Sequence, residues 1–302
     1  MSLLDSVVVA TLPLVPKALV RHFADPYIAG ETLNDAIKAV KSLNRQGACA
    51  TIDVLGESVT HAAETKSAVN KYLKVIEVIE KENLDANISI KPTQLGLGLD
   101  FDLCRDNFLK IIKELKKRDN FVRVDMEDSP YTTLTYDLYQ ALKEEYDKVG
   151  VVMQAYMRRS MKDLEERVIP VKNANIRLCK GIYIEPAEIA YKNFDIVRKN
   201  YIKLLKRAFE NNVYVGIATH DEMLVWESTQ LIEKMGIKKD RYEFQMLLGV
   251  TESLRRQIIA EGHKMRVYVP FGKDWYAYST RRLKENPRVA GYVFKDIFHI
   301  GK

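Results

Sequence analysis

Cationic and hydrogen-bonding residues cluster in one short stretch in the second half of the chain. Arg177, Lys180 and the adjoining Gly181-Ile182 backbone lie within six residues of one another. Guanidinium, ammonium and free N–H groups bind the oxygens of a phosphate or pyrophosphate. Upstream, the side-chain amide of Gln154 offers a donor and an acceptor side by side, which suits the polar edge of a ring. Together these residues predict a site for a phosphate-bearing ligand that also carries a ring.

A second cationic group occurs near the end of the sequence. Four residues spaced i, i+3, i+4 and i+7 share one face of a helix: Tyr278, Arg281, Arg282 and Glu285. Such a stripe is typical of a solvated charged face. It also suits a helix folded over a ligand site, where Arg281 and Arg282 would grip a small carboxylate. Both interpretations stay open at this level.

The elements that must position these residues appear as an alternation along the chain. Short runs rich in Val, Ile and aromatic residues alternate with longer stretches of helical periodicity. The eight runs begin at Cys49, Asn87, Phe121, Val149, Asn175, Val213, Tyr242 and Arg266. Successive starts lie 24 to 38 residues apart, enough for one strand, one helix and two short connections. Eight such units predict an α/β fold, a (β/α)8 TIM barrel; an open doubly wound sheet is the main rival.

We expect residues 1–302 to form a single catalytic domain, with 1–48 as an N-terminal helical extension and 49–302 as the barrel. Ser58 is the expected N-cap of a helix over 59–81. Glu185-Pro186 precedes an expected helix over 187–209. The last three strands are each followed by an expected helix start, at Asp221, Thr251-Glu252 and Lys273-Asp274.

The beginning of the sequence is apolar but does not resemble a membrane span. It lacks a basic stretch before the apolar run, which argues against a secretory signal. Pro13 and Pro16 interrupt the run well short of the ~20 residues that a spanning helix needs. We expect a helix packed on the domain, and a membrane-touching segment is the alternative.

Most of the predicted strands end in polar or ionisable residues. These are Asp53 and Glu57, then Lys91, Thr93 and Gln94, then Asp125 and Glu127, Gln154 and Tyr156, Arg177, Lys180 and Tyr183, Thr219, His220 and Asp221, and Tyr268. In a TIM barrel the carboxyl ends of the strands carry the catalytic groups. A single charge there is explained by an ion pair that fills the barrel. So many polar groups on one rim predict a functional site.

Composition narrows the chemistry of that site. The five histidines are scattered and only His220 falls on the rim, so no metal site is expected. The three cysteines lie far apart, as is typical of reduced intracellular thiols. A net charge of +6 favours phosphates, carboxylates or an anionic membrane face as partners. No basic run with interleaved aromatic residues predicts nucleic-acid binding.

A series of short motifs occurs in the order typical of one family. They are DVLGE from Asp53, SIKPTQLG from Ser89, RVDME from Arg123, MQAY from Met153, RLCKGIY from Arg177, ATHD from Ala218, YVPFG from Tyr268 and YSTRRLKEN from Tyr278. From about Tyr27 to Asn286 the chain resembles the monofunctional bacterial proline dehydrogenases. The resemblance implies a distorted (β/α)8 barrel that binds FAD noncovalently. It also implies oxidation of L-proline to Δ1-pyrroline-5-carboxylate by hydride transfer, the first step of proline catabolism.

The resemblance assigns roles residue by residue. It makes Asp125 and Arg177 catalytic. It makes these residues substrate-binding: Lys91, Tyr183, Tyr268, Tyr278, Arg281 and Arg282. It makes these residues cofactor-binding: Met126, Gln154, Arg177, Lys180, Gly181, Ile182, Thr219 and His220. Glu57 resembles an acidic gate that pairs with Arg281 when the site closes. Two departures from the family pattern are small: Cys179 stands where valine is common and Asp221 where asparagine is common.

The resemblance also implies partners and a location. Electrons are expected to pass to a quinone-type acceptor at the membrane surface. The protein is then expected in the cytoplasm, peripheral to the inner face of the cell membrane, and able to form oligomers.

Two other functions stay open. A lyase that forms a Schiff base on Lys91 or Lys180 would explain the lysines of the rim. It would not explain the Arg281-Arg282 pair or Gln154. A nonenzymatic protein that binds an anionic metabolite on a barrel scaffold is the alternative from another class.

Overall fold

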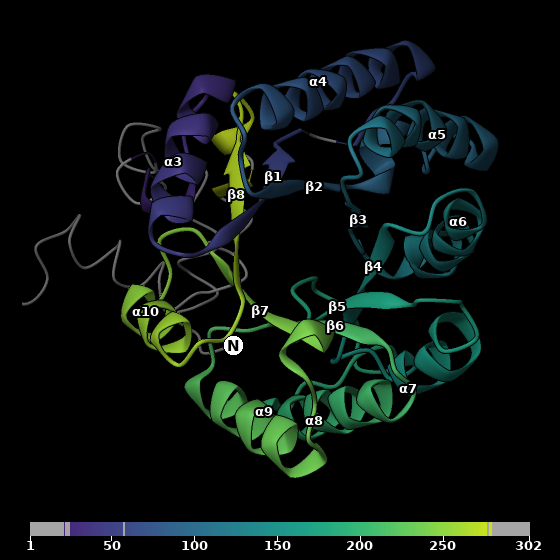
Figure 1. Cartoon of the computed structure of the whole chain (residues 1–302). Helices are drawn as coiled ribbons and strands as arrows, with labels where there is room; N and C mark the ends of the chain where they lie inside the picture. The colour runs from purple at the N-terminus through teal and green to yellow at the C-terminus, as the bar shows by residue number, and fades with distance from the viewer. Residues whose placement is uncertain (1–20, 22–24, 57, 277, 280–302) are drawn as a thin grey trace, which may run out of the picture.

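Eight strands close into a barrel in the computed structural model, which describes residues 21, 25–56, 58–276, 278 and 279 (Figure 1). The strands follow chain order around the barrel, every neighbouring pair is parallel, and β8 closes against β1. They are β1 Cys49–Val54, β2 Ala86–Ile90, β3 Val122–Val124, β4 Val149–Gln154, β5 Asn175–Cys179, β6 Tyr214–Ala218, β7 Tyr242–Leu247 and β8 Met265–Phe271. The predicted (β/α)8 barrel is confirmed, and closure excludes the open doubly wound sheet.

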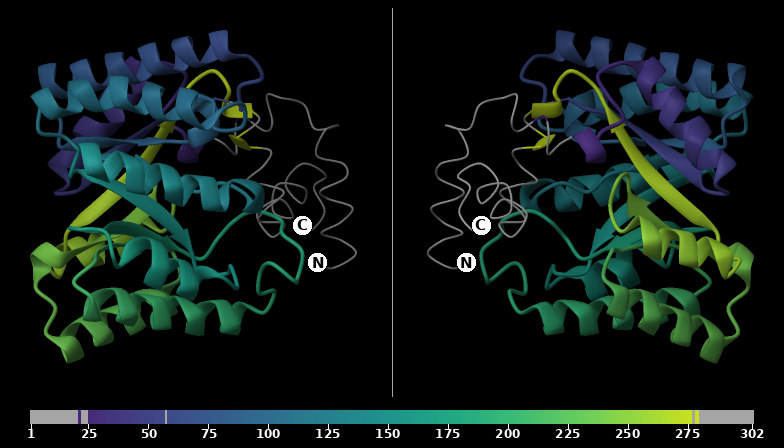
Figure 2. Two further views of the ribbon diagram at one scale, coloured as in Figure 1. Left: turned by 90° about the vertical axis from the view of Figure 1, so that its right-hand side faces the viewer. Right: turned by 90° about the vertical axis from the view of Figure 1, so that its left-hand side faces the viewer.

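Helices surround the barrel and connect its strands (Figure 1), and the side views of Figure 2 show strand β8 running obliquely inside this helical layer. They are α3 Leu33–Arg45, α4 Ala62–Lys81, α5 Phe101–Lys117, α6 Thr132–Glu145, α7 Ser160–Asp163, α8 Phe194–Glu210, α9 Glu222–Met235 and α10 Glu252–Ala260. Helix α3 precedes β1 and contacts both β1 and β8. The division of the chain at residue 48 stays a prediction. Among the described helices, none combines the length and the apolar character needed to cross a bilayer.

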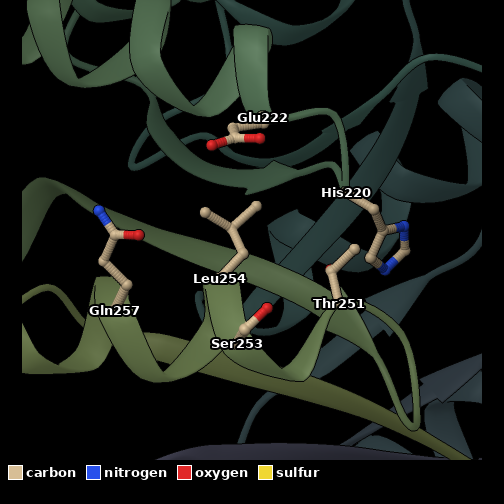
Figure 3. A pocket seen from close by; sticks show the side chains of 6 residues that line it. All are labelled: His220, Glu222, Thr251, Ser253, Leu254 and Gln257. Carbon is tan, nitrogen blue, oxygen red and sulfur yellow. The ribbon is translucent and has the colours of Figure 1, made fainter.

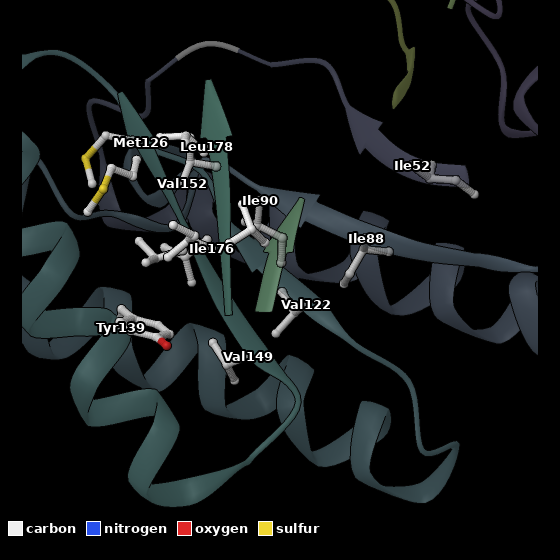
Figure 4. Close-up of a cluster of buried hydrophobic side chains, with 14 of the residues drawn as sticks. Ile52, Ile88, Ile90, Val122, Met126, Tyr139, Val149, Val152, Ile176 and Leu178 are labelled. Carbon is white, nitrogen blue, oxygen red and sulfur yellow. The ribbon is translucent and has the colours of Figure 1, made fainter. Parts of the chain in front are cut away.

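The strands alternate between apolar and polar residues, and this alternation separates two layers. Ile52 of β1 and Ile88 of β2 belong to an apolar cluster that also contains Tyr139 of α6 (Figure 4). The intervening residues face the barrel interior. Arg177 of β5 donates a hydrogen bond to Ser89 of β2, and these strands are not neighbours, so the two side chains meet across the interior. The apolar core therefore lies between sheet and helices, whereas the inside of the barrel is polar.

A buried charge pair occupies the amino-terminal part of the interior. Arg266 of β8 binds both carboxylate oxygens of Glu243 on β7, through Nε at 2.7 Å and through Nη2 at 3.1 Å. Its Nη1 donates to the backbone oxygen of Ala50 at 2.7 Å. Two parallel N–H···O bonds between planar groups are the strong form of such a pair, and they fix both side chains.

Helix α4 begins later than predicted. The Glu64 carboxylate accepts hydrogen bonds from the backbone N–H groups of Thr60 at 2.8 Å and His61 at 3.2 Å. The helix therefore begins after His61, and the assignment of Ser58 as its N-cap was wrong. Ser58 instead donates a hydrogen bond to Thr93 in the loop after β2. The competing signal was the glutamate three residues into the helix, which satisfies the first free donors.

Helix α8 also begins later than predicted, at Phe194 rather than at residue 187. The Asn193 side chain accepts hydrogen bonds from the backbone N–H groups of Asp195 at 2.9 Å and Ile196 at 3.1 Å, which defines the N-cap. Before that point the chain turns back, and Tyr191 N–H donates to the backbone oxygen of residue 156.

The helix starts predicted after the sixth and seventh strands are confirmed. Asp221 precedes α9 as its N-cap, and Thr251 precedes α10. The helix predicted after Lys273-Asp274 lies largely outside the described residues.

Candidate active site

The carboxylate of Asp125 is the hydrogen-bonding centre of the barrel mouth. Asp125 follows β3, and its Oδ1 accepts hydrogen bonds from Ser89 Oγ at 2.6 Å and from Arg177 Nη1 at 2.8 Å. Its Oδ2 accepts one from the Tyr268 hydroxyl at 3.1 Å. These partners come from β2, β5 and β8, so strands from around the barrel hold one carboxylate. The two residues predicted to be catalytic, Asp125 and Arg177, are in direct contact.

Lys91 brings a cation to the same centre. Its Nζ lies 2.9 Å from Asp53 Oδ2 and 4.0 Å from Asp125 Oδ2. Burial alone would lower the pKa of Lys91, but the two carboxylates outweigh it and raise the pKa above its ordinary value. Lys91 therefore stays an ammonium at neutral pH. A Schiff-base lysine must present a neutral amine, so this environment argues against that function for Lys91.

Arg177 is anchored through two of its three side-chain nitrogens. Nε donates to Gln245 Oε1 at 2.6 Å, and Nη1 donates to both Ser89 and Asp125. The guanidinium carbon lies 5.1 Å from the centre of the Tyr268 ring, a cation–π contact. Within the described part of the chain, Nη2 has no hydrogen-bond partner. Its N–H groups are therefore available to a ligand.

The loop after β5 has a backbone conformation that glycine adopts readily. Gly181 has a φ of +109°, and a Cβ at this position would overlap the ring of Tyr156. On one side of it, Lys180 Nζ lies 3.2 Å from Asp221 Oδ2. On the other side, Ile182 is 49% exposed. The segment predicted to hold a phosphate is thus an accessible loop with a cation beside it.

Gln154 occupies the end of β4 and is buried. Its Nε2 donates to the backbone oxygen of Glu127 at 3.0 Å, which fixes the direction of the amide. The Glu127 carboxylate in turn accepts from Thr93, through the backbone N–H at 2.9 Å and through Oγ1 at 2.6 Å. Met126, another predicted cofactor contact, is 6% exposed and belongs to the apolar core cluster.

Thr219 and His220 lie beyond the end of β6. The backbone N–H of Leu247 donates to His220 Nε2 at 2.8 Å, so this nitrogen is the unprotonated one. Thr219 is buried, and its Oγ1 accepts from the backbone N–H of Asp221. A cavity of about 210 Å³ opens next to His220 (Figure 3). It is lined by His220, Glu222, Thr251, Ser253, Leu254 and Gln257.

The remaining predicted residues are distributed unevenly. Tyr183 is half-buried in the loop after β5. Tyr278 is 7% exposed and packs with Ile28 and Leu55. Three predicted residues lie outside the described residues: Glu57, Arg281 and Arg282.

Among the described residues, the site shows neither a cluster of metal ligands nor a reactive cysteine. Across the described ranges, no three His, Cys, Asp or Glu side chains come close enough to hold a metal ion. Cys49, Cys104 and Cys179 are all free thiols. Burial raises the pKa of Cys49 and of Cys179 to about 11, and it also raises the pKa of Cys104.

Residues 36–294 match the family model described as "Proline dehydrogenase". The chain belongs to the proline dehydrogenase family. Proline dehydrogenase 2 of Bacillus subtilis is 36% identical over 91% of this chain and 90% of its own length. Proline dehydrogenase of Deinococcus radiodurans is 36% identical over 90% of this chain and 89% of its own length. Members of the proline dehydrogenase family are oxidoreductases.

A solved structure supports the fold alone. Proline utilization A from Bdellovibrio bacteriovorus, inactivated by N-propargylglycine, is 24% identical and superposes with a TM-score of 0.82. The match covers 93% of this chain but only 36% of the longer chain. The proline dehydrogenase barrel of our chain thus has the architecture of one part of that protein.

Two residues of this proline dehydrogenase site were not predicted to have a role there. Asp53 was placed on the rim but given no role, and it holds Lys91. Gln245 was not considered, and it holds Arg177. A sequence signal existed for Gln245, because Glu243 and Gln245 alternate with apolar residues in a strand that is otherwise apolar. Two polar residues on one face of such a strand indicate a polar barrel interior.

Proposed function

We propose that this protein oxidises L-proline to Δ1-pyrroline-5-carboxylate, with noncovalently bound FAD as the hydride acceptor. The observation that carries the proposal is the cluster of Lys91, Asp125 and Arg177 at the barrel mouth, in a chain of the proline dehydrogenase family. In this cluster, Lys91 provides a cation that can bind a carboxylate. Arg177 provides Nη2 donors that bind no other described residue.

FAD supplies the two-electron acceptor that amino-acid side chains lack. The chain offers a suitable set of groups to hold it. Arg177 Nη2 and the Lys180 ammonium provide cationic donors, and the backbone at Gly181 and Ile182 provides N–H groups. The fixed amide of Gln154 suits a polar ring edge. Because a Cβ at Gly181 would overlap Tyr156, the absence of a side chain keeps this loop close to the barrel.

Thr219 and His220 are proposed to bind a more distant part of the same ligand. The cavity beside His220 is open, and polar side chains contribute most of its lining. Its lining residues follow β6 and β7, and Asp221 beside His220 lies 3.2 Å from Lys180, a position that suits a long nucleotide lying across several strand ends. Met126 is proposed to contribute packing contacts from the core side.

The substrate carboxylate is proposed to bind Lys91 together with Arg281 and Arg282. Paired N–H donors would fix the carboxylate and hence the orientation of the reacting carbon. The positive charge of Lys91 also disfavours the protonated form of a nearby amine, and hydride loss needs the neutral amine. Tyr183, Tyr268 and Tyr278 are proposed to form the walls around the ring. Glu57 is proposed to pair with Arg281 on closure.

Electrons are proposed to leave to a quinone-type acceptor at the cytoplasmic face of the cell membrane. The support is electrostatic, because the net charge of +6 attracts the protein to an anionic surface. Addition of anionic vesicles that contain a quinone should then speed reoxidation relative to neutral vesicles with the same quinone. Equal rates with both vesicles would remove the membrane from the proposal.

The decisive experiment is an anaerobic absorbance spectrum of the purified protein before and after addition of L-proline. We expect a flavin spectrum that L-proline bleaches and that D-proline and L-alanine leave oxidised. A flavin that stays oxidised would exclude proline as the substrate. A colourless protein that does not take up FAD would end the proposal.

A further inference from the structure

Gln245 connects the site arginine to the charge pair deeper in the barrel. Its Oε1 accepts from Arg177 Nε at 2.6 Å, and its Nε2 donates to Glu243 Oε1 at 2.7 Å. The same Glu243 oxygen accepts from Arg266 Nε at 2.7 Å. Gln245 is 6% exposed, so both halves of its amide are used away from solvent. An amide with both ends engaged has one orientation, because a flip would set donor against donor.

The barrel makes room for this contact at a single position. Arg177 lies on β5 and Gln245 on β7, so the contact must pass over β6. Gly216 of β6 is in register with Arg177 on one side and with Glu243 on the other. A Cβ at Gly216 would overlap the amide nitrogen of Gln245. The missing side chain therefore leaves the space through which the amide reaches the guanidinium.

Two anchors on different edges determine the plane of a guanidinium. Nε of Arg177 is bound to Gln245 and Nη1 is bound to Asp125. With both in place, the guanidinium plane is fixed, and Nη2, which has no hydrogen-bond partner among the described residues, keeps a single direction. Without the Gln245 contact, Nε has no anchor, and the group is held only by the bonds of Nη1 to Ser89 and Asp125 and by the Tyr268 ring, so the direction of Nη2 is fixed less strictly.

We propose that Gln245 is a positioning residue that aims Arg177 Nη2 at the bound ligand. Glu243 and Arg266 hold Gln245 in turn. The inference rests on the proposed function only in taking the ligand of Arg177 to be FAD. It assigns Gln245 no contact with substrate or cofactor, and its effect passes entirely through Arg177.

The test is a double-mutant cycle on FAD affinity, measured by titrating flavin-free protein with oxidised FAD and no substrate. The variants are Gln245→Met, Arg177→Met and both together. Methionine matches the length of glutamine, but it has no donor and its thioether sulfur is only a weak hydrogen-bond acceptor. We expect Gln245→Met to weaken FAD binding about 10-fold or more, since a hydrogen bond to a charged group is lost. We expect the double variant to bind FAD no more weakly than Arg177→Met alone.

A matched control isolates this contact from glutamine–arginine contacts in general. Gln140 and Arg167 form such a contact on the outer helices, with Gln140 Nε2 donating to the Arg167 backbone and Arg167 Nη1 donating to Gln140 Oε1. Gln140→Met should leave FAD affinity and the flavin midpoint potential unchanged. Gln245→Met should shift the midpoint potential in the same direction as Arg177→Met, a response that a purely structural residue would not produce.

Each outcome decides the inference. A double variant in which the two losses of FAD affinity multiply would mean that Gln245 acts independently of Arg177, and the inference would be wrong. Wild-type affinity in Gln245→Met would also overturn it. The titration contains no proline, so its result does not depend on the substrate. Failure of the proposed function would appear separately, as a wild-type flavin that L-proline does not bleach.

Discussion

Asp53 holds the ammonium of Lys91 at 2.9 Å from a position that solvent does not reach. The two residues come from adjacent strands, Asp53 near the end of β1 and Lys91 just after β2. Because Asp53 is fully buried, its carboxylate limits the directions in which Lys91 points. The cation of the site is thus positioned by a buried neighbour.

Replacing Asp53 tests that dependence. Asp53→Asn keeps the shape but removes the charge, so Lys91 should move toward Asp125 and lose its fixed direction. We expect kcat/KM for L-proline to fall by about 10- to 100-fold, the size of a lost charged hydrogen bond. Steady-state kinetics would measure this. Tyr72→Phe is the control, because it removes only the longer contacts of the Tyr72 hydroxyl, 3.4 Å to Asp53 and 3.2 Å to Gln94, and keeps the charge of Asp53, so it should have a much smaller effect. An unchanged kcat/KM in Asp53→Asn would exclude a positioning role.

A pair of glycine variants tests the loop after β5. Gly181 and Gly236 both have positive φ, but only at Gly181 would a Cβ meet another side chain. Gly236→Ala should therefore cost only about 1 kcal/mol of stability, the price of a left-handed alanine, and keep full FAD occupancy. Gly181→Ala should displace the loop and lower FAD occupancy strongly. The flavin-to-protein absorbance ratio and the Tm report the two effects. Equal occupancy in both variants would show that this loop does not hold the cofactor.

The Glu243–Arg266 pair predicts a defined response to acid. Burial alone would raise the pKa of Glu243, but Arg266 outweighs it and lowers the pKa to about 2. A carboxyl whose pKa is lowered on folding stabilises the protein above its unfolded pKa and loses that contribution as the pH falls toward 2. Wild-type stability should therefore decrease on acidification below the unfolded pKa of about 4.5.

Glu243→Gln should remove that dependence and leave Arg266 buried without its charge partner. We expect a loss of about 3–5 kcal/mol in the free energy of unfolding at pH 7, measured by urea titration. The difference between wild type and variant should shrink at lower pH. Glu82→Gln, which breaks the exposed ion pair with Lys41, is the control and should change little. A difference that grows on acidification would contradict the assignment.

Thiol reactivity tests the burial of the cysteines. With a pKa of about 11, Cys49 and Cys179 form little thiolate at pH 8. Relative to an unfolded thiol with a pKa of about 8.5, iodoacetamide labelling should be at least about 100-fold slower. Intact-mass measurement in native buffer and in urea would give the two rates. Rapid labelling of the native protein would mean that these strands open.

The barrel was predictable because its outward-facing residues repeat so regularly. Ile52, Ile88 and Val122 each alternate with a polar residue that faces inward, and that alternation sets the strand positions. Predicted and observed strand starts differ by at most one residue, as at Val213 against Tyr214. Helix starts were less predictable. Ser58 was expected to cap helix α4, but Glu64 binds the backbone N–H groups at the helix start instead. Pro186 was expected to precede a helix, but it begins a turn.

The site was predictable only as a set of strand ends. Asp125 and Arg177 were both expected on the rim, but no sequence pattern shows that they touch. The role of Gln245 depends on Gly216, which lies on the strand between those of Arg177 and Gln245 and is in register with Arg177, so it is a property of register around a closed barrel. Such relationships become visible only when the shear of the barrel is known.

Strands β1 and β8 pair over the whole length from Cys49 to Val54, although Cys49 and its hydrogen-bond partner Met265 lie 216 residues apart in the sequence. A nascent chain on the ribosome therefore makes the first strand long before the last. Until β8 emerges, one edge of β1 carries unpaired backbone N–H and C=O groups, the kind of edge along which chains aggregate. Closure of the ring is a late, non-local event, and such contacts slow folding. The exposure of the barrel to misassembly therefore lasts until its final strand has been synthesised and paired.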